Sequence, residues 1–418
     1  MLLYTILNVI KDFFIPLKIN SSKKITLTKN GIKLDFAQII NGKIITFILK
    51  SIEEKIVEKL PQVFLVDKEF FSNFQIEIEV NEDYSHYLKQ IQIEEEYALF
   101  WLDDDHVECT YYKKKDSKNI IIKPNLTKEK IETSVNIMED QLTNYFLNIL
   151  IKRLFLLNSV VVFPAERSSL AIFYKDLLSR SYNLLDLFMR NKDEFDKVKK
   201  SISKYPKPLS DYINFLNECT TKPLVKKRNP FLKIAEKIEK QILKGKYQLN
   251  DDKIVYNYSN RLKELELYST SSLVKTIVGI TFYLKYMAKR EDYFLIDEPE
   301  LNLHPSNQRQ LARIFATMIN NGIKIIMTTH SPYIMNEFNN LIMLGKITDK
   351  DKKLEIMSKF NILENEVIVP EKISSYLIID KQVKKMKMAE YGIELDTFND
   401  VIDDMNNLND EIYLAIES

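Results

Sequence analysis

The sequence predicts an α/β protein in which helices flank a mixed or parallel sheet, with an antiparallel β subdomain and a helical insertion attached. Two short strand-like runs, at residues 293–296 and 324–329, are separated by a helical pattern, which is the spacing of a parallel strand–helix–strand crossover. Residues 17–125 contain short apolar runs and turns, which predicts antiparallel strands. Residues 166–245 are helical in pattern, and four prolines divide them into short helices.

Composition and charge exclude several classes of protein. The chain has 418 residues, 45% of them apolar and 28% charged, which is the balance of a folded globule and not of a disordered or collagen-like chain. Its 60 Lys and Arg residues nearly equal its 59 Asp and Glu residues, so any nucleic-acid surface must be local. The two cysteines, Cys109 and Cys219, form neither a disulfide framework nor a zinc spacing, which favours a cytoplasmic protein.

The first 17 residues are apolar, but we expect neither a signal peptide nor a membrane span there. Lys11 and Asp12 interrupt the run, and it lacks a basic n-region and a small-residue cleavage site. Its apolar residues recur at helical spacing, so we interpret it as a buried amphipathic helix ending near Pro16. Residues 24–36 are predicted to form a β-hairpin with Asn30-Gly31 as its turn.

Two polar runs in the β-rich segment have a functional and a structural interpretation. Strands are predicted at 74–80 and 97–102, and the run Asp-Asp-Asp-His at 103–106 follows the second. This run is a candidate metal site, but clustered acids are also common at solvated hairpin tips, which is the interpretation we favour. The lysines at 113–115 are likewise interpreted as solvated and not as a patch for DNA.

The middle of the chain is predicted to be mostly helical. Residues 127–157 carry an apolar face at helical spacing, and a strand at 159–163 precedes the sequence PAERSSL (164–170). The last helix of the 166–245 segment stops at Gly245. Its apolar stripe consists of Phe231, Ile234, Ala235, Ile238 and Ile242. One or two strands at 253–268 and a helix at 271–289 follow.

Several of the candidate functional residues lie in one segment, residues 293–305, YFLIDEPELNLHP. The apolar run is typical of a buried parallel strand, and it ends in Asp297 and Glu298, at the edge where open α/β sheets bind ligands. Asp297 can hold Mg²⁺, because that ion prefers carboxylates and substrate phosphates. Glu298 can then position or deprotonate an attacking water.

A second strand brings a histidine to the same edge of the sheet. A helix is predicted at 306–320 with Ser306 as its N-cap and Gly322 as its stop, followed by the strand 324–329 and His330. Because the crossover is parallel, we expect His330 to lie beside Asp297 and Glu298. A histidine at this edge can contact a terminal phosphate, so its contacts would depend on whether that phosphate is present.

These motifs resemble those of ABC-type ATPases of the SMC/Rad50-like kind, and most closely AAA-family ATPases of the AAA15/AAA21 group, which are common in bacterial defence systems. DEPELNLHP is similar to their Walker B motif and D-loop, and TTHSPY (328–333) to their switch-histidine segment. PAERSSL, residues 269–289 and the tail from 369 to 413 are similar to further segments of the family. The resemblance implies an ABC-type P-loop NTPase head that uses ATP and Mg²⁺.

The resemblance also implies roles for individual residues around the Walker B motif. Glu298 and His330 are the implied catalytic residues. Asp297 is the implied ligand of the metal and contributes to the nucleotide site, together with His304 of the D-loop.

Ser271 and Ser272 match the signature serine of the family, which contacts the γ-phosphate held by a partner subunit. The usual glycine is missing there, and Leu273 follows instead, which leaves a plain capped helix start as the structural alternative.

Four parts follow from the resemblance. Residues 1–165 would form the N-terminal part of the head, with the helix after Walker A and the β-rich subdomain. Residues 166–250 would be the helical insertion, 251–345 the C-terminal lobe with the signature, Walker B, D-loop and H-loop, and 346–418 the α/β tail.

The sequence contains no G-x-x-x-x-G-K-[ST] phosphate loop, since none of its 7 glycines lies in that frame. MLLYTI at residues 1–6 resembles the helix that follows this loop in the family, so we expect the loop and two strands upstream of Met1. As written, the chain should bind ATP poorly or not at all, because backbone N–H groups and the loop lysine supply most phosphate binding. An upstream in-frame motif would confirm this expectation, and an in-frame stop without one would refute it.

The implied function is an ATP-dependent assembly switch. Two heads would sandwich two Mg²⁺–ATP, as a homodimer or higher homo-oligomer, and hydrolysis would separate them. The family context implies anti-phage defence beside an effector such as a nuclease. The alternative is a non-hydrolysing scaffold or sensor subunit that has lost its nucleotide.

Two further hypotheses remain. In the first, Asp349-x-Asp351 belongs to an OLD-like nuclease, although little chain is left for a nuclease domain there. In the second, Lys199-Lys200 and Lys226-Lys227-Arg228 contact DNA, although solvated helix faces explain both runs equally well.

Overall fold

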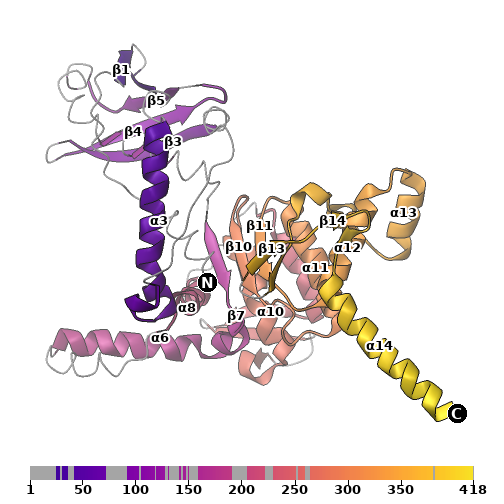
Figure 1. The fold of residues 1–418 in the computed structure, drawn as a ribbon. Helices are drawn as coiled ribbons and strands as arrows, with labels where there is room; N and C mark the ends of the chain where they lie inside the picture. Colours follow the sequence, from indigo (N-terminus) through magenta and orange to yellow (C-terminus); the bar gives the residue numbers. More distant parts are fainter. Residues whose placement is uncertain are drawn as a thin grey trace. The chain divides into compact units, whose positions relative to one another are not determined.

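The computed structural model describes the chain in segments (Figure 1). They are residues 25–28, 31–35, 42–71, 92–102, 105–117, 119–127, 130, 141–142, 145–146, 149, 159–190, 205–221, 229–250, 253–258, 264–379 and 382–417. The chain divides into two compact units, one of residues 1–160 with 204–208, and one of 161–203 with 209–418. Within the described segments, we find no helix that combines the length and apolarity needed for a membrane span.

The first unit is built on an antiparallel sheet. Its strands are β1 (Ile25–Thr28), β2 (Gly31–Asp35), β3 (Ile93–Leu102), β4 (Asp105–Lys113) and β5 (Asn119–Pro124), in the order β1-β2-β5-β4-β3. All four pairings are antiparallel, which confirms the predicted β subdomain. A long helix, α3 (Gly42–Phe64), and a 3₁₀ turn (Lys68–Phe71) complete the described elements of this unit.

Alternating apolar residues explain why this sheet is buried on one face. Ile32 and Leu34 of β2 lie opposite Ile122 and Ile120 of β5, and all four side chains are buried. Around Tyr111, aromatic rings from β3 and from residues 145–146 pack edge-on, with 4.9 Å between the ring centres of Tyr111 and Phe146.

One expectation for this unit was wrong, and a second was wrong for one residue. Thr28 pairs with Gly31, so Gly31 belongs to β2 and not to the turn. Lys114 and Lys115 are exposed as expected, but Lys113 is buried: only 1% of its surface is exposed, and its amine donates a hydrogen bond to the Lys114 carbonyl over 3.3 Å. The desolvation lowers the pKa of Lys113, while the charge of Asp116 raises it. The predicted strand 74–80, most of the helix 127–157 and residues 103–104 lie outside the described residues.

The second unit contains a sheet in the order β11-β10-β6, formed by β6 (Val160–Phe163), β10 (Tyr293–Asp297) and β11 (Lys324–Thr328). β10 and β11 are parallel, and Asp297 lies opposite Thr328. The helix between them, α11 (Pro305–Asn320), forms the predicted crossover. Its N-cap is His304 and not Ser306, because Pro305 occupies the first helical turn, where its missing N–H costs nothing.

The structure contains further helices. They are α6 (Arg167–Arg190), α8 (Lys207–Thr221), α9 (Leu232–Ile238), α10 (Ser272–Phe282), α12 (Pro332–Lys346), α13 (Lys350–Lys359) and α14 (Asp396–Glu417). π-helical turns extend α9 over Glu239–Leu243 and α10 over Tyr283–Met287. Short 3₁₀ turns occur at Leu267–Ser269, Glu364–Glu366 and Pro370–Lys372.

Small antiparallel sheets complete the second unit. One contains β7 (Lys246–Asn250), β8 (Lys253–Asn257) and β9 (Leu265–Glu266). The others are the hairpins β12 (Tyr376–Ile379) with β13 (Gln382–Lys385), and β14 (Met388–Ala389) with β15 (Gly392–Ile393).

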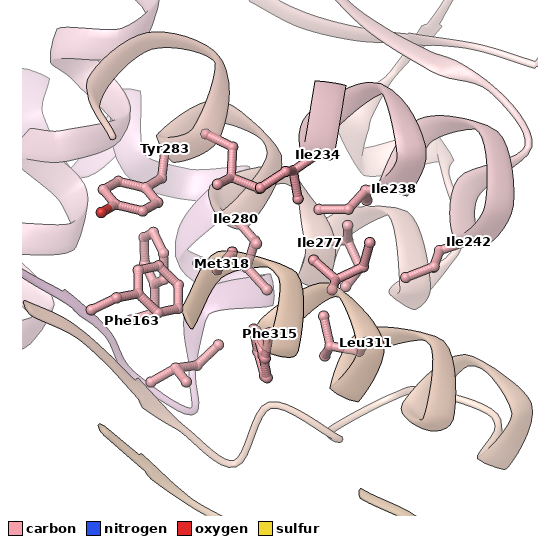
Figure 2. Close-up of a cluster of buried hydrophobic side chains, with 14 of the residues drawn as sticks. Phe163, Ile234, Ile238, Ile242, Ile277, Ile280, Tyr283, Leu311, Phe315 and Met318 are labelled. Atoms are coloured by element: carbon pink, nitrogen blue, oxygen red, sulfur yellow. The ribbon is translucent and has the colours of Figure 1, made fainter. Parts of the chain in front are cut away.

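The core of this unit lies between the three-stranded sheet and its helices (Figure 2). The predicted stripe on α9 is confirmed, since Ile234, Ile238 and Ile242 are all buried and face side chains of α10 and α11. Phe163 of β6 packs edge-on against Phe294 of β10, with 4.7 Å between ring centres. This packing fixes the strands whose ends carry the candidate site.

Candidate functional site

The ends of β10 and β11 form a polar rim, as the crossover predicts. The Thr328 hydroxyl donates a hydrogen bond to the Asp297 carboxylate, and Asp297 is exposed although the three residues before it are buried. The backbone N–H of Glu298 donates to the Thr328 carbonyl over 3.2 Å, and it also points at the Thr328 hydroxyl. The two neighbouring acids are therefore held against β11 by one threonine.

The backbone turns sharply at Glu298. Its φ of 44° is in the left-handed region, which costs a residue with a side chain roughly 1–2 kcal/mol. Asn302, four residues on, has a φ of 62°, a conformation that asparagine tolerates better. A strained residue at the end of a buried strand persists only where its surroundings hold it.

Arg167 holds this turn. One guanidinium nitrogen donates to the Asp297 carbonyl over 2.7 Å, and the other donates to the Glu298 carbonyl over 2.8 Å. The first nitrogen also donates to the Pro164 carbonyl over 3.2 Å, so PAERSSL and the β10 turn are joined by one side chain. Arg167 is 1% exposed. Its desolvation lowers the pKa of the guanidinium, while Tyr212 and the carboxylates of Glu300, Asp297 and Glu298 raise it.

Glu300 connects the turn to the histidine. Its Oε1 accepts a hydrogen bond from the backbone N–H of His330 over 2.6 Å. Its Oε2 is buried and has no hydrogen-bond partner among the described residues. His330 itself is exposed, so its ring is free to face a ligand while its backbone is fixed to the turn. Asp297, Glu298 and His330 thus come together at one rim.

The segment after His330 is tied to α11. Ser331 caps α12, and its hydroxyl donates to Gln308 Oε1 over 2.5 Å. Gln308 in turn donates to the Leu303 carbonyl over 2.9 Å. His304 is exposed, and its Nδ1 lies 2.9 Å from the Ser306 hydroxyl. The hydrogen bonds of His304 are those of a helix cap and do not reach the rim.

The two signature serines begin α10. Ser271 is its N-cap and accepts a hydrogen bond from the Val274 N–H over 3.4 Å. Both serines are exposed, so capping and contact with a second molecule are compatible. Asn302 donates to Thr276 of α10 over 3.4 Å, which links this helix to the turn after β10.

The rim can hold Mg²⁺ through one carboxylate, that of Asp297. Magnesium takes one or two protein carboxylates together with substrate phosphates, and the exposed Asp297 held by Thr328 meets that need. The described part of the chain contains no group of three or more His, Cys, Asp or Glu able to hold a metal by themselves.

Asp297, Glu298 and His330 were predicted to lie at this rim. Arg167, Glu300 and Thr328 were not given a role, although each lies within one of the motifs described above. A charged residue in PAERSSL, directly after a buried strand, was the one signal that could have drawn attention to Arg167.

Other candidate residues lie elsewhere. Asp349 caps α13 by accepting from the N–H groups of Asp351 and Lys352 over 3.1 and 3.2 Å, so the Asp349 carboxylate has a structural role. The lysine and arginine runs at 199–200 and 226–228 lie outside the described residues.

The fold and the rim define an α/β domain in which two acidic residues and an exposed histidine lie at the ends of two parallel strands. Residues 5–335 match the family described as AAA ATPase domain (AAA_15), and the chain belongs to that family. The energy-coupling factor transporter ATP-binding protein EcfA2 of Streptococcus sanguinis (strain SK36) is 22% identical over 119 residues. That match covers 28% of this chain and 42% of the relative, so the chain spans less than half of that protein's length.

Two solved structures show a weak similarity. The Smc head bound to the C-winged helix domain of ScpA has a TM-score of 0.25 and 11% identity, over 56% of this chain and 63% of that one. The Smc head domain with an extended coiled coil, bound to the C-terminal domain of ScpA derived from Pyrococcus furiosus, has a TM-score of 0.23 and 14% identity. That match covers 56% of this chain and 68% of the other.

Proposed function

We propose that this protein binds and hydrolyses ATP at the rim of β10 and β11, and that nucleotide occupancy switches its assembly. The proposal rests on two hydrogen bonds that join the ends of β10 and β11: one from the Thr328 hydroxyl to the Asp297 carboxylate, and one from the His330 backbone N–H to the Glu300 carboxylate. Membership in a family of ATPase domains supports it.

Each residue of the rim has a role that follows from its position. Asp297 holds the metal, which neutralises phosphate charge when bound. Glu298, which directly follows the last residue of β10, orients the attacking water and accepts its proton. His330 contacts the terminal phosphate. Ser271 and Ser272, at the exposed start of α10, approach the nucleotide of a second head.

Calorimetry with Mg²⁺–ATP tests the proposal against a scaffold that has lost its nucleotide. Because the chain contains no phosphate loop, we expect weak but Mg²⁺-dependent affinity in the wild type. We expect the same affinity but no turnover in Glu298→Gln, and loss of the Mg²⁺-dependent affinity in Asp297→Asn. A folded wild type that shows no binding heat would support the scaffold and contradict the proposal.

The switch is tested by sedimentation. Mg²⁺–ATP should shift Glu298→Gln to a stable dimer or larger homo-oligomer, since hydrolysis no longer separates the heads. Wild type should shift only transiently. An identical sedimentation coefficient with and without nucleotide would contradict the switch while leaving hydrolysis intact.

We also propose that the switch serves anti-phage defence in the cytoplasm, by controlling an effector such as a nuclease that acts on DNA. The resemblance of the Walker B and histidine segments to defence ATPases supports this role. In a susceptible bacterial host, the complete locus should lower phage plating, and Glu298→Gln should abolish that protection. Equal plating with wild type and variant would contradict it.

A further inference from the structure

The C-terminal helix α14 carries an unpartnered apolar stripe. Val401, Met405, Leu408 and Ile412 follow one another at spacings of four, three and four residues, which places them on one face. Each is at least half exposed: 60%, 66%, 61% and 50%. A helix of 22 residues is about 33 Å long. An apolar face of that length, left in water, indicates an interaction surface.

The charge of α14 restricts what can cover this stripe. Residues 396–417 contain seven Asp and Glu residues and neither Lys nor Arg. Asp404 and Glu411 immediately precede Met405 and Ile412, so they border the stripe along one side. The complementary surface is apolar with a basic edge.

The hairpin of β12 and β13 is such a surface. Tyr376 and Ile378 on β12 lie on the same face as Val383, and these side chains are 56%, 73% and 68% exposed. Lys384 and Lys385 on β13 are also exposed. Lys385 lies opposite Tyr376 on the apolar face, whereas Lys384 is on the other face of the strand. The hairpin therefore presents apolar side chains and a lysine on one face, with a second lysine next to it in the strand.

The helix and the hairpin of one chain do not cover each other. Leu395 is buried and Phe398 packs against the core, so the start of α14 is anchored. From there the helix projects away from the rest of its unit (Figure 1). The exposure of both apolar surfaces shows that the part of the chain that the structure describes covers neither of them.

We propose that α14 of one copy docks on the β12–β13 hairpin of a second copy, and that the exchange is mutual. A two-fold arrangement uses each helix and each hairpin once and closes the assembly as a dimer. It requires neither nucleotide nor the β10–β11 rim, so it goes beyond the proposed switch and is tested separately from it.

A charge exchange tests the contact without nucleotide. In Lys384→Glu/Lys385→Glu the hairpin becomes acidic like the helix, and in Asp404→Lys/Glu411→Lys the side of the helix that borders the stripe becomes basic like the hairpin. Each variant alone should self-associate at least about tenfold more weakly than wild type by sedimentation velocity. An equimolar mixture should regain the wild-type affinity, because each helix then meets a hairpin of opposite charge.

The matched control is Lys350→Glu/Glu355→Lys on the exposed face of α13, which should associate like wild type. Circular dichroism checks that every variant is folded. The proposal is overturned if wild type is monomeric, if neither double variant loses affinity, or if the mixture fails to regain it. A monomeric wild type whose α14 binds a different protein would assign the stripe to a foreign partner.

Discussion

At the scale of single residues, the β10 turn depends on Arg167. This side chain supplies hydrogen bonds to two consecutive carbonyls, and the second belongs to a residue with a left-handed backbone. Charge-assisted hydrogen bonds of this kind are stronger than neutral ones and are not replaced by water in a buried place. Arg167 is therefore a positioning residue for Asp297 and Glu298.

We predict that Arg167→Gln lowers the free energy of unfolding by about 1–3 kcal/mol, because it leaves buried carbonyls without donors. It should also reduce the rise in melting temperature caused by Mg²⁺–ATP, and Arg167→Lys should restore part of that rise. Thermal melts with and without nucleotide separate the two effects. A purely structural role would lower both melting temperatures equally.

The two cysteines give a second prediction at this scale. Burial raises the pKa of the Cys219 thiol to about 12 and that of Cys109 to about 11, both above the ordinary value of 9.0. The native fold therefore favours the protonated thiols, and their contribution to stability is complete below pH 9 and lost as the pH rises toward these values.

We expect neither thiol to react with a disulfide reagent at pH 8 in the native protein, and both to react after denaturation. Counting released chromophore before and after adding guanidinium checks this. Rapid native reaction of one equivalent would show that one of the two sites is open to solvent.

Part of the candidate site could be predicted from the sequence. An apolar run that ends in two acids, and a second that ends in a histidine, place Asp297, Glu298 and His330 at one edge because parallel strands share an end. The role of Arg167 could not be predicted, since its partners lie about 130 residues further along the chain and are backbone atoms. Hydrogen bonds to carbonyls leave no pattern in the partner's sequence.

At the scale of elements, α8 and α10 make a close contact at a glycine. A Cβ at Gly279 would overlap the Tyr212 hydroxyl, and it would lie 3.0 Å from the nearest ring carbon. Tyr212 is fully buried, and its hydroxyl has no hydrogen-bond partner among the described residues. The glycine is thus required by packing and not by backbone conformation.

We predict that Gly279→Ala lowers the free energy of unfolding by about 1–3 kcal/mol through overpacking. Tyr212→Phe alone should cost little, since it removes an unpaired hydroxyl, and it should reduce the cost of Gly279→Ala. Chemical denaturation of the four members of this double-mutant cycle measures the coupling. Strict additivity would rule out the proposed clash.

Helices with a strong apolar periodicity were predictable from the sequence, but the residues at which they begin and end were harder to predict. The stripe on α9 and the crossover helix α11 follow directly from apolar spacing. The N-cap of α11 was misassigned by two residues, because a histidine is a less common cap than the serine nearby. The small hairpins of the tail were not predicted individually, since strands of two to four residues carry too little pattern.

At the scale of the whole molecule, the structure divides into two compact units, and the four parts that the resemblance implies stay a prediction. The division reflects contacts between segments distant in sequence, such as β6 beside β10, which sequence order does not reveal. The nearly balanced charge of the whole chain hides a strongly acidic α14 and a basic β13. Local charge, and not the net charge of the chain, therefore indicates where an interaction surface lies.

Metal-directed cleavage tests the central claim, that the ends of β10 and β11 hold the metal and phosphate of a nucleotide. Fe²⁺ replaces Mg²⁺, and peroxide then produces radicals that cut the backbone near the bound ion. With ATP present, we predict cuts near residues 297–300 and 328–330, absent without nucleotide and absent in Asp297→Asn. ATP-dependent cuts confined to other segments, or none in a folded wild type, would contradict the account.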